Sequence, residues 1–287
     1  MSKLAIIGGS GAYKKLELLS DSIKLNPIET PFGFGANIYK FQNDKLSYYF
    51  LSRHGDKGYH TSAATVNYRA NIWSLKSLGV ERIISWSGPG IINPKLKVGS
   101  LAVPDDIIDL TKQRPSTFFT KQGLGFIRFS NTFCPSLRQA IIEQLSEENI
   151  PFTDKATYLC TEGPRLETRA EIRMFDNYGA DLVGMTLAPE TFLARELEIC
   201  YSAICYLTNF AEGVLARNYE EGELFEGMQT AEEKKSVDYT LSVLPAIAVK
   251  ALGNIANSKR ECDCKNAMLR YRKQGTITDD WRKWIDP

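Results

Sequence analysis

The chain has 287 residues, of which 43% are hydrophobic and 24% are charged, as is typical of a globular protein with a substantial core. Its 35 basic and 34 acidic residues leave a formal net charge of +1, so broad attraction to nucleic acid or to an anionic membrane is not expected. Glycines break the N-terminal apolar run from Gly8 onward, and no run approaches the ~18 apolar residues of a membrane span. We therefore expect a cytoplasmic protein that binds neither nucleic acid nor membrane.

Six cysteines, at positions 134, 160, 200, 205, 262 and 264, are too sparse for the disulfide framework of a secreted domain. Cys262-Asp263-Cys264 forms a C-x-C pair, for which a structural or redox role is the alternative to free thiols. Because the chain has only two histidines, we expect no metal site. Free thiols are the favoured interpretation.

Strand and helix patterns alternate along the chain. Buried strands are predicted at residues 3–7, 82–86, 181–185 and 201–207, with strand character also at 101–110 and antiparallel strands within 27–52. Helices are predicted at residues 61–78, 135–147, 168–178, 189–199 and 230–255. This order indicates an α/β fold with a largely parallel or mixed sheet covered on both faces. We expect one domain over residues 1–258, followed by a peripheral, charged C-terminal tail at 259–287.

Small or polar residues follow five of the predicted strands. The clusters are Gly8–Gly11, Arg53-His54, Ser87–Gly90, Met185-Thr186 and Thr208-Asn209. In such sheets ligands bind outside the carboxyl ends of the strands, so five such clusters predict one shared site.

The first two clusters have residues suited to an anion. The glycines around Ser10 expose backbone N–H groups, although the segment matches neither the dinucleotide fingerprint nor a P-loop, and a turn without a ligand is the alternative. Arg53 offers a planar, permanently charged fork for phosphate oxygens, and His54 could donate a further hydrogen bond. A solvated turn is the alternative for this pair.

Four motifs resemble the methylthioadenosine phosphorylase branch of the purine-nucleoside phosphorylases. They are Ser52-Arg-His-Gly, Val66-Asn-Tyr-Arg-Ala-Asn-Ile-Trp, Thr161-Glu-Gly-Pro-Arg-Leu-Glu-Thr-Arg-Ala-Glu and Gly179-Ala-Asp-Leu-Val-Gly-Met-Thr-Leu-Ala-Pro-Glu. The resemblance runs from about residue 3 to 250. It implies a three-layer α/β sandwich, phosphate as cosubstrate without a metal or other cofactor, and homotrimers or hexamers with active sites near subunit boundaries.

Carried over position by position, the resemblance also implies site residues. The phosphate site falls on Ser10, Arg53, His54, Ser87 and Thr186. The sugar and base pocket falls on Gly88, Gly90 and Met185, with Leu166 in place of the family's usual Phe. Phe126 or Phe129 would cross into a neighbouring subunit's site, and packing in the chain's own core is the alternative.

Two positions bear on the base. The adenine-specific branch resembles Thr-Asp-Tyr-Asp where this chain has Thr208-Asn-Phe-Ala, and Asn209 can donate to a 6-keto oxygen and accept from N7–H. Glu167 stands where that branch has Ser or Thr, and its carboxylate can accept from N1–H of a 6-oxopurine. With His54, these are the predicted catalytic residues. The alternatives are a plain turn residue for Asn209 and a helix-start carboxylate for Glu167.

The sequence thus predicts an enzyme that cleaves a purine nucleoside with phosphate, prefers a 6-oxopurine, and releases ribose 1-phosphate or 5-methylthioribose 1-phosphate. No histidine follows His60, so we expect no histidine at the sugar's 5′ end. The alternatives are a methylthioadenosine phosphorylase acting on 6-aminopurines, a hydrolase that uses water, and a non-catalytic nucleoside-binding homologue.

Overall fold

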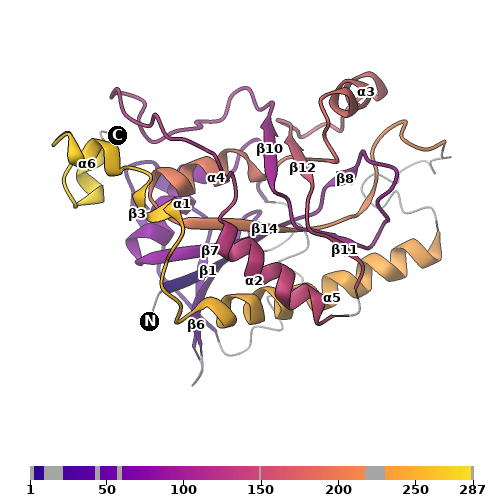
Figure 1. The fold of residues 1–287 in the computed structure, drawn as a ribbon, viewed down its shortest axis with the longest axis horizontal. Coiled ribbons are helices and arrows are strands. Elements are labelled where there is room, and N and C mark those ends of the chain that lie inside the picture. Colours follow the sequence, from indigo (N-terminus) through magenta and orange to yellow (C-terminus); the bar gives the residue numbers. More distant parts are fainter. Residues whose placement is uncertain are drawn as a thin grey trace.

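A mixed sheet lies at the centre of the computed structural model, which describes residues 3–9, 22–42, 46–56, 60–148, 150–216 and 230–285 (Figure 1). Within these residues the sheet has eight strands, in the spatial order β11 (Phe152–Thr153), β9 (Leu101–Ala102), β14 (Cys200–Tyr206), β7 (Val80–Ser87), β1 (Lys3–Gly8), β6 (Ser47–Ser52), β5 (Ile38–Gln42) and β2 (Ser22–Lys24). Strands β14, β7, β1 and β6 are parallel, so the carboxyl ends of these four neighbours lie at one edge.

A second, five-stranded sheet adjoins that edge. Its spatial order is β10 (Asp106–Asp109), β12 (Thr157–Cys160), β13 (Leu182–Gly184), β8 (Gly90–Ile91) and β15 (Asn209–Phe210), and β3 (Glu29–Thr30) pairs separately with β4 (Gly33–Phe34). The chain passes from the first sheet to the second between β7 and β8, β9 and β10, β11 and β12, and β14 and β15. Gly88-Pro89 connects β7 to β8, and Leu207-Thr208 connects β14 to β15. The ends of β7 and β14 therefore lie where the two sheets meet.

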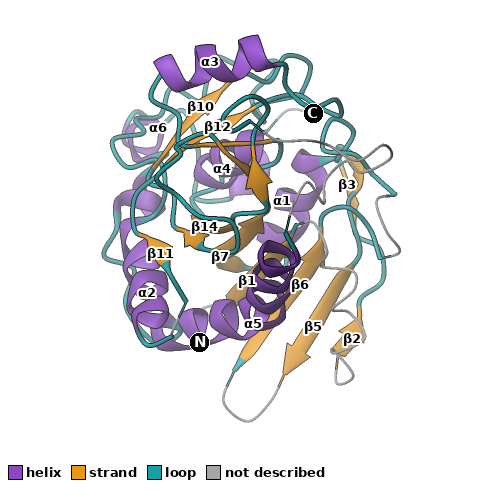
Figure 2. Cartoon of the chain, turned by 90° about the vertical axis from the view of Figure 1, so that its right-hand side faces the viewer, coloured by secondary structure: helices purple, strands orange, loops and turns teal. Residues whose placement is uncertain are grey.

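Helices cover both faces of the larger sheet (Figure 2). Helices α2 (Pro135–Ser146) and α5 (Ala231–Ile255) pack on one face, α1 (Tyr68–Ser77) and α4 (Leu187–Glu196) pack on the other, and α3 (Arg169–Asn177) packs on the second sheet. Successive side chains of β1 point to opposite faces of the sheet. Leu4 and Ile6 pack in the core beneath α2 and α5, and Ala5 and Ile7 pack in the core beneath α1 and α4. Each buried Leu or Ile contributes roughly 1.5–3 kcal/mol. The predicted three-layer α/β architecture is confirmed.

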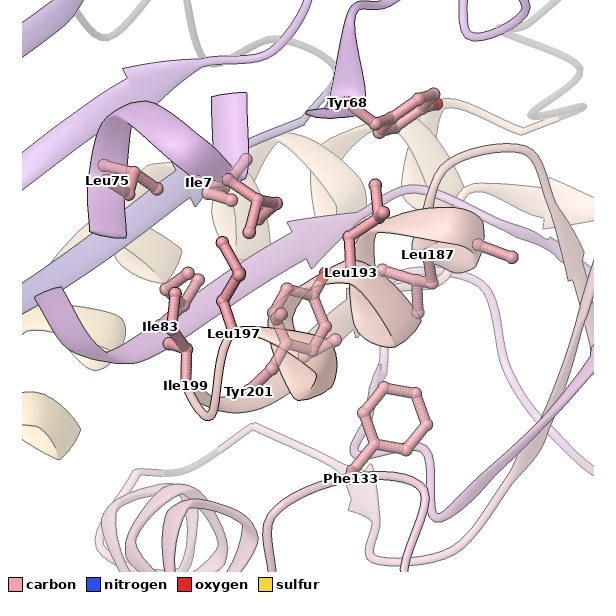
Figure 3. Close-up of a cluster of buried hydrophobic side chains, with 14 of the residues drawn as sticks. Ile7, Tyr68, Leu75, Ile83, Phe133, Leu187, Leu193, Leu197, Ile199 and Tyr201 are labelled. Atoms are coloured by element: carbon pink, nitrogen blue, oxygen red, sulfur yellow. The ribbon is translucent and has the colours of Figure 1, made fainter. Parts of the chain in front are cut away.

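The core beneath α1 and α4 joins residues from distant parts of the chain. Figure 3 shows Ile7 from β1, Leu75 from α1 and Leu193 from α4 in one cluster of buried side chains. This packing fixes α4 against the carboxyl ends of the parallel strands.

Element boundaries follow local capping. Helix α1 begins at Tyr68 and not near residue 61, because the Asn67 side chain accepts a hydrogen bond from the backbone N–H of Ala70. The predicted strand at 101–110 is divided into β9 and β10 around Pro104, which has no backbone N–H to give to a sheet. The other predicted helices lie within a few residues of their expected positions.

The C-terminal segment is part of the packed core, which corrects the prediction of a peripheral tail. It contains the short helices η2 (Asp263–Asn266), α6 (Leu269–Lys273) and η3 (Trp281–Trp284). Met268 and Trp284 are buried among residues of the α1–α4 core. Glu198 holds the segment by accepting from the Met268 N–H at 2.9 Å and pairing with Arg272 at 2.8 Å. The prediction rested on the many charged residues of the segment and overlooked the few apolar residues between them, which are buried. Across the described residues, no helix combines the length and apolar character needed to cross a membrane.

Candidate active site

Four of the five residues assigned to phosphate lie at or just beyond the ends of three neighbouring strands of the parallel core, and the fifth, Thr186, follows β13 of the second sheet. Arg53 and His54 follow β6, Ser87 ends β7, and Ser10, two residues past the end of β1, lies outside the described residues. Gly9 shows how close the first strand end lies to its neighbours, because a Cβ there would be 2.4 Å from the Trp86 carbonyl oxygen and 3.1 Å from Nη1 of Arg53. Only glycine allows this approach, so the strand ends converge as predicted.

The side chain of Arg53 is fully buried and binds within the protein. Its Nε and Nη2 donate to the two carboxylate oxygens of Glu190 at 2.8 and 2.7 Å, and Nη2 also donates to the Ser85 hydroxyl at 2.6 Å. Burial alone would lower the pKa of Arg53, but the Glu190 carboxylate raises it well above its ordinary value. The fork that the sequence offers to phosphate is therefore occupied by Glu190. Nη1, 3.5 Å from the Trp86 carbonyl and next to Gly9, is the nitrogen that faces the glycine loop.

His54 is held in one tautomer. Its Nδ1 lies 2.8 Å from the carbonyl oxygen of Thr61, and because a carbonyl only accepts, Nδ1 carries the proton. Burial, and then the charge of Arg53, lower the pKa of His54 to about 4. The ring is neutral at pH 7 and its Nε2 has a lone pair. In this tautomer Nε2 of His54 can accept a hydrogen bond, whereas the sequence predicts a donor at this position.

Two hydroxyls join the larger sheet to the smaller one. The Ser87 hydroxyl at the end of β7 lies 3.2 Å from the hydroxyl of Thr186, which follows β13 and precedes α4. Tyr158 of β12 completes the group, with its hydroxyl 3.1 Å from that of Ser87. Burial raises the pKa of Tyr158 far above its ordinary value, so it stays protonated. The structure thus brings together Ser87 and Thr186 as predicted and adds Tyr158, which no sequence signal indicated.

The positions assigned to sugar and base lie across neighbouring strands of the second sheet. Gly90 of β8 pairs with Asn209 of β15 on one side and with Val183 of β13 on the other. Met185 comes two residues later, with its sulfur 2.5 Å from where a Cβ on Gly163 would lie. At Gly88 a Cβ would lie 2.6 Å from the ring of Tyr206, so this turn also requires glycine. The sugar and base positions therefore share one edge next to the Ser87–Thr186 pair.

The two residues assigned to the base are held by neighbouring groups. Glu167 accepts from the Thr161 hydroxyl at 2.6 Å, and burial raises the pKa of its carboxyl. Asn209 accepts from the Thr208 hydroxyl at 2.7 Å and donates to the Phe210 carbonyl at 2.9 Å. Leu166 is partly buried beside Glu167. Glu167 directly precedes Thr168, which caps α3 together with Glu171, but it is partly buried and so differs from the exposed helix-start carboxylate of the alternative interpretation.

Arg114 holds together segments around the candidate site, and sequence reasoning missed it. Its buried guanidinium donates to the backbone carbonyls of Thr161, Glu162, Met185 and Ala188. It also pairs with the Glu162 carboxylate at 3.3 Å. One side chain thus links the end of β12 to the segment between β13 and α4, yet it lies in a loop without any motif.

Phe126 and Phe129 differ in environment. Phe126 is 77% exposed, and its backbone N–H donates to the hydroxyl of Tyr271 at 2.9 Å. Phe129 packs edge-to-face on Phe192, with ring centroids 5.3 Å apart. Phe126 is therefore not a core residue, and Phe129, which is partly buried, contacts Phe192 of its own chain.

Comparison with known proteins agrees with this arrangement. A profile described as "Phosphorylase superfamily" matches residues 3–245. The 6-oxopurine nucleoside phosphorylase of Pyrococcus furiosus is 38% identical over 276 residues, which cover 93% of this chain and 98% of that protein. The probable S-methyl-5′-thioinosine phosphorylase of Thermodesulfovibrio yellowstonii is 36% identical over 273 residues, with 93% and 96% covered. A crystal structure of a methylthioadenosine phosphorylase from an antarctic soil metagenomic library has a TM-score of 0.80 and 32% identity, with 93% and 90% covered.

The chain belongs to the phosphorylase superfamily. Within it, the relatives described above are phosphorylases of purine nucleosides or their methylthio counterparts. The resemblance found in the four sequence motifs is confirmed.

Proposed function

We propose that the protein cleaves a purine nucleoside by phosphorolysis, releasing the free base and ribose 1-phosphate or 5-methylthioribose 1-phosphate, with a preference for 6-oxopurines. One observation carries this proposal. The anion-binding side chains at the ends of β6 and β7 meet Thr186 through the 3.2 Å Ser87–Thr186 contact, and the base positions on β8 and β15 adjoin them. The 6-oxopurine nucleoside phosphorylase and S-methyl-5′-thioinosine phosphorylase relatives support the same activity.

In this mechanism the protein mainly positions phosphate and stabilises charge. Ser87 and Thr186 donate hydroxyl hydrogen bonds to the phosphate, with Ser10 and Nη1 of Arg53 completing the site. Neutral His54 accepts the hydrogen bond of the single phosphate O–H at Nε2, which leaves the ionised oxygens for the donors. One of these oxygens attacks the anomeric carbon as the bond to the base breaks. Phosphate is the cosubstrate, and the proposal needs no other cofactor.

The base departs with negative charge that the second sheet must stabilise. Asn209 donates to O6 and accepts from N7–H, and Glu167 accepts from N1–H. Both polar ends of the Asn209 side chain bind neighbouring groups in the structure, and a bound base would replace these contacts with Thr208 and Phe210. Adenine has no proton on N1, so it would place a lone pair against the Glu167 carboxylate where a 6-oxopurine donates N1–H, and this favours 6-oxopurines.

We further propose that the active form is a homotrimer or a hexamer. The support within the chain is Phe126, an aromatic side chain that is 77% exposed on a segment tied to Tyr271. Such a residue is suited to cover the sugar site of an adjacent subunit.

A second candidate is phosphorolysis of methylthioadenosine. It is favoured by the S-methyl-5′-thioadenosine phosphorylase of Pyrococcus furiosus, which is 42% identical over 211 residues, 73% of this chain and 80% of that protein. Against it stand Glu167 and Asn209, whose hydrogen-bonding capacities match a 6-keto base.

Product analysis tests the proposed reaction. Purified protein is incubated with inosine and inorganic phosphate, and ³¹P NMR follows the phosphorus signals while chromatography follows hypoxanthine. We expect ribose 1-phosphate in a one-to-one ratio with hypoxanthine. Free ribose in that ratio, with no new phosphorus signal, would identify a hydrolase instead. Release of neither product from any purine nucleoside would support the non-catalytic homologue.

A further inference from the structure

Four cysteines from three separate parts of the chain meet at one buried point. Cys134 precedes α2, Cys200 opens β14, and the other two, Cys262 and Cys264, lie in the C-terminal segment. All four are buried, and their sulfur atoms lie within 4.8 Å of one another. The remaining two cysteines, Cys160 and Cys205, are buried elsewhere and outside this group.

We propose that these four cysteines form a structural zinc site that fastens the C-terminal segment to the α/β body. Zinc takes four thiolates in a tetrahedron with Zn–S bonds of about 2.3 Å, which places the sulfurs about 3.8 Å apart. The sulfurs of Cys200 and Cys262 are 3.3 Å apart and all four sulfurs lie within 4.8 Å of one another, so the cluster has the size of such a tetrahedron. Soft thiolate ligands in a tetrahedral set select zinc over the hard cations. Four protein ligands leave no open position, so the site would hold structure and perform no catalysis.

The contacts around the cluster fit a site that joins segments. The backbone N–H of Cys134 donates to the Tyr201 carbonyl at 2.8 Å, which holds the start of α2 against β14. Two residues before Cys200, Glu198 has a positive φ of 57° and binds Met268 and Arg272 of the C-terminal segment. The C-terminal segment therefore returns to the start of β14, as Figure 1 shows, and delivers Cys262 and Cys264 there.

A positively charged side chain next to the four cysteines is also consistent with a zinc site. Four thiolates around Zn²⁺ leave a net charge of −2, which needs a cation close by. Arg260 lies beside Cys200, and its guanidinium also donates to the Glu198 carbonyl. Its Nε is buried and has no hydrogen-bond partner among the described residues. A thiolate of the zinc site would supply that partner.

Disulfides are the rival for the same cysteines. A disulfide requires its two sulfurs to approach to about 2.05 Å, and it uses cysteines in pairs. The sulfurs of Cys200 and Cys262 are 3.3 Å apart, and all six cysteines are free thiols in the structure. The four sulfurs form one group and not two bonded pairs, which favours a shared metal ion. This inference revises the expectation of free thiols without a metal, and it is independent of the proposed phosphorylase activity.

The test is the metal content of the full-length chain, purified without added metal or chelator and measured by inductively coupled plasma mass spectrometry. We expect about one zinc per chain. In the Cys264→Ser variant the zinc content per chain should fall at least tenfold. Cys160→Ser, a buried cysteine outside the cluster whose Sγ contacts the Ala188 carbonyl, should keep it. X-ray absorption at the zinc edge should show four sulfur neighbours at about 2.3 Å.

The wild-type measurements decide the matter even if the Cys264→Ser variant does not fold. Metal-free wild-type protein, whether intact-mass analysis finds free thiols or the 2 Da loss of each disulfide, would overturn the proposal. Zinc with nitrogen or oxygen neighbours in place of sulfur would also overturn it, as would equal zinc loss in both cysteine variants.

Discussion

The guanidinium of Arg53 and the carboxylate of Glu190, 137 positions apart in the chain, form a two-point ion pair in which neither side chain is exposed. Tyr201 adds a hydrogen bond to the same carboxylate at 2.5 Å. This pair links the residue after β6 to helix α4, whose preceding residue Thr186 contacts Ser87. We therefore expect stability and the proposed phosphate binding to depend on the same contact.

Removing Glu190 should damage both properties. Breaking a buried ion pair leaves an uncompensated charge and costs about 3–5 kcal/mol. We expect Glu190→Gln to lower the free energy of unfolding by about 3 kcal/mol and to raise the KM for phosphate, measured by urea denaturation and by initial rates. The double variant Arg53→Met, Glu190→Leu should recover most of the stability and none of the phosphate-dependent turnover. Recovery of turnover in the double variant would show that Arg53 has no role in the reaction.

The buried neutral His54 should make stability depend on pH. Its pKa is about 4 in the folded chain and about 6.5 when unfolded, so the unfolded state binds the extra proton between these values. The stability contribution is therefore complete above pH 6.5 and is lost as the pH falls towards 4, by about 3 kcal/mol in total. His54→Asn keeps a donor for the Thr61 carbonyl and removes the titrating ring. Urea denaturation at several pH values should show a flatter slope for this variant, and an unchanged slope would contradict the assigned pKa.

Replacing Asn209, which we propose to contact the base, should change the base preference. Asn209→Asp removes the donor for O6 and adds an acceptor for a 6-amino group, a change of roughly 1–3 kcal/mol for each unpaired group. We expect the ratio of kcat/KM for methylthioadenosine to that for methylthioinosine to rise about tenfold or more. Because the two substrates have the same sugar, the ratio serves as its own control. A ratio that stays constant would place the base away from Asn209.

Glu167→Ala tests the other side of the base. Since its carboxylate is proposed to accept from N1–H, the variant should lose more kcat/KM with inosine than with adenosine. Glu171→Ala is a matched control, because Glu171 lies on the same helix start but belongs to the capping box of α3. Equal losses with both nucleosides would assign Glu167 a purely structural role.

The exposed Phe126 should act across a subunit boundary. Sedimentation velocity should find a trimer or a hexamer, and Phe126→Ala should raise the KM for nucleoside severalfold. Phe34→Ala, which removes another aromatic side chain with 59% exposure, should leave that KM unchanged. A fully active monomer would refute the proposed assembly.

The general plan of the fold could be predicted because periodicity and capping are local. Buried runs such as Lys3–Gly8 predict strands, and Thr168 with Glu171 and the following Gly179 predicts both ends of α3. The convergence of five polar clusters followed from one rule about parallel strands. The start of α1 could not be predicted, because Asn67 as its cap also depends on the contact of its side chain with the Phe32 carbonyl.

Contacts between residues far apart in the chain could not be predicted from the sequence. Nothing near Arg53 indicates that its fork binds Glu190, and nothing near Arg114 indicates that it binds four carbonyls across the pocket. Because residues 259–287 contain many charged side chains, the sequence predicted an exposed segment, and the burial of Met268 and Trp284 was not expected. Cysteines as far apart as 134 and 264 became a group only once the chain was folded.

The most direct test of the central claim is one panel of inosine, guanosine, adenosine, methylthioinosine and methylthioadenosine, assayed with and without inorganic phosphate. Base release should require phosphate for every substrate that is cleaved, because phosphate is the proposed nucleophile, bound by the hydroxyls of Ser87 and Thr186 in that proposal. The highest kcat/KM should belong to a 6-oxopurine nucleoside. Equal turnover without phosphate would contradict phosphorolysis, and faster cleavage of methylthioadenosine than of both inosine and methylthioinosine would contradict the base assignment.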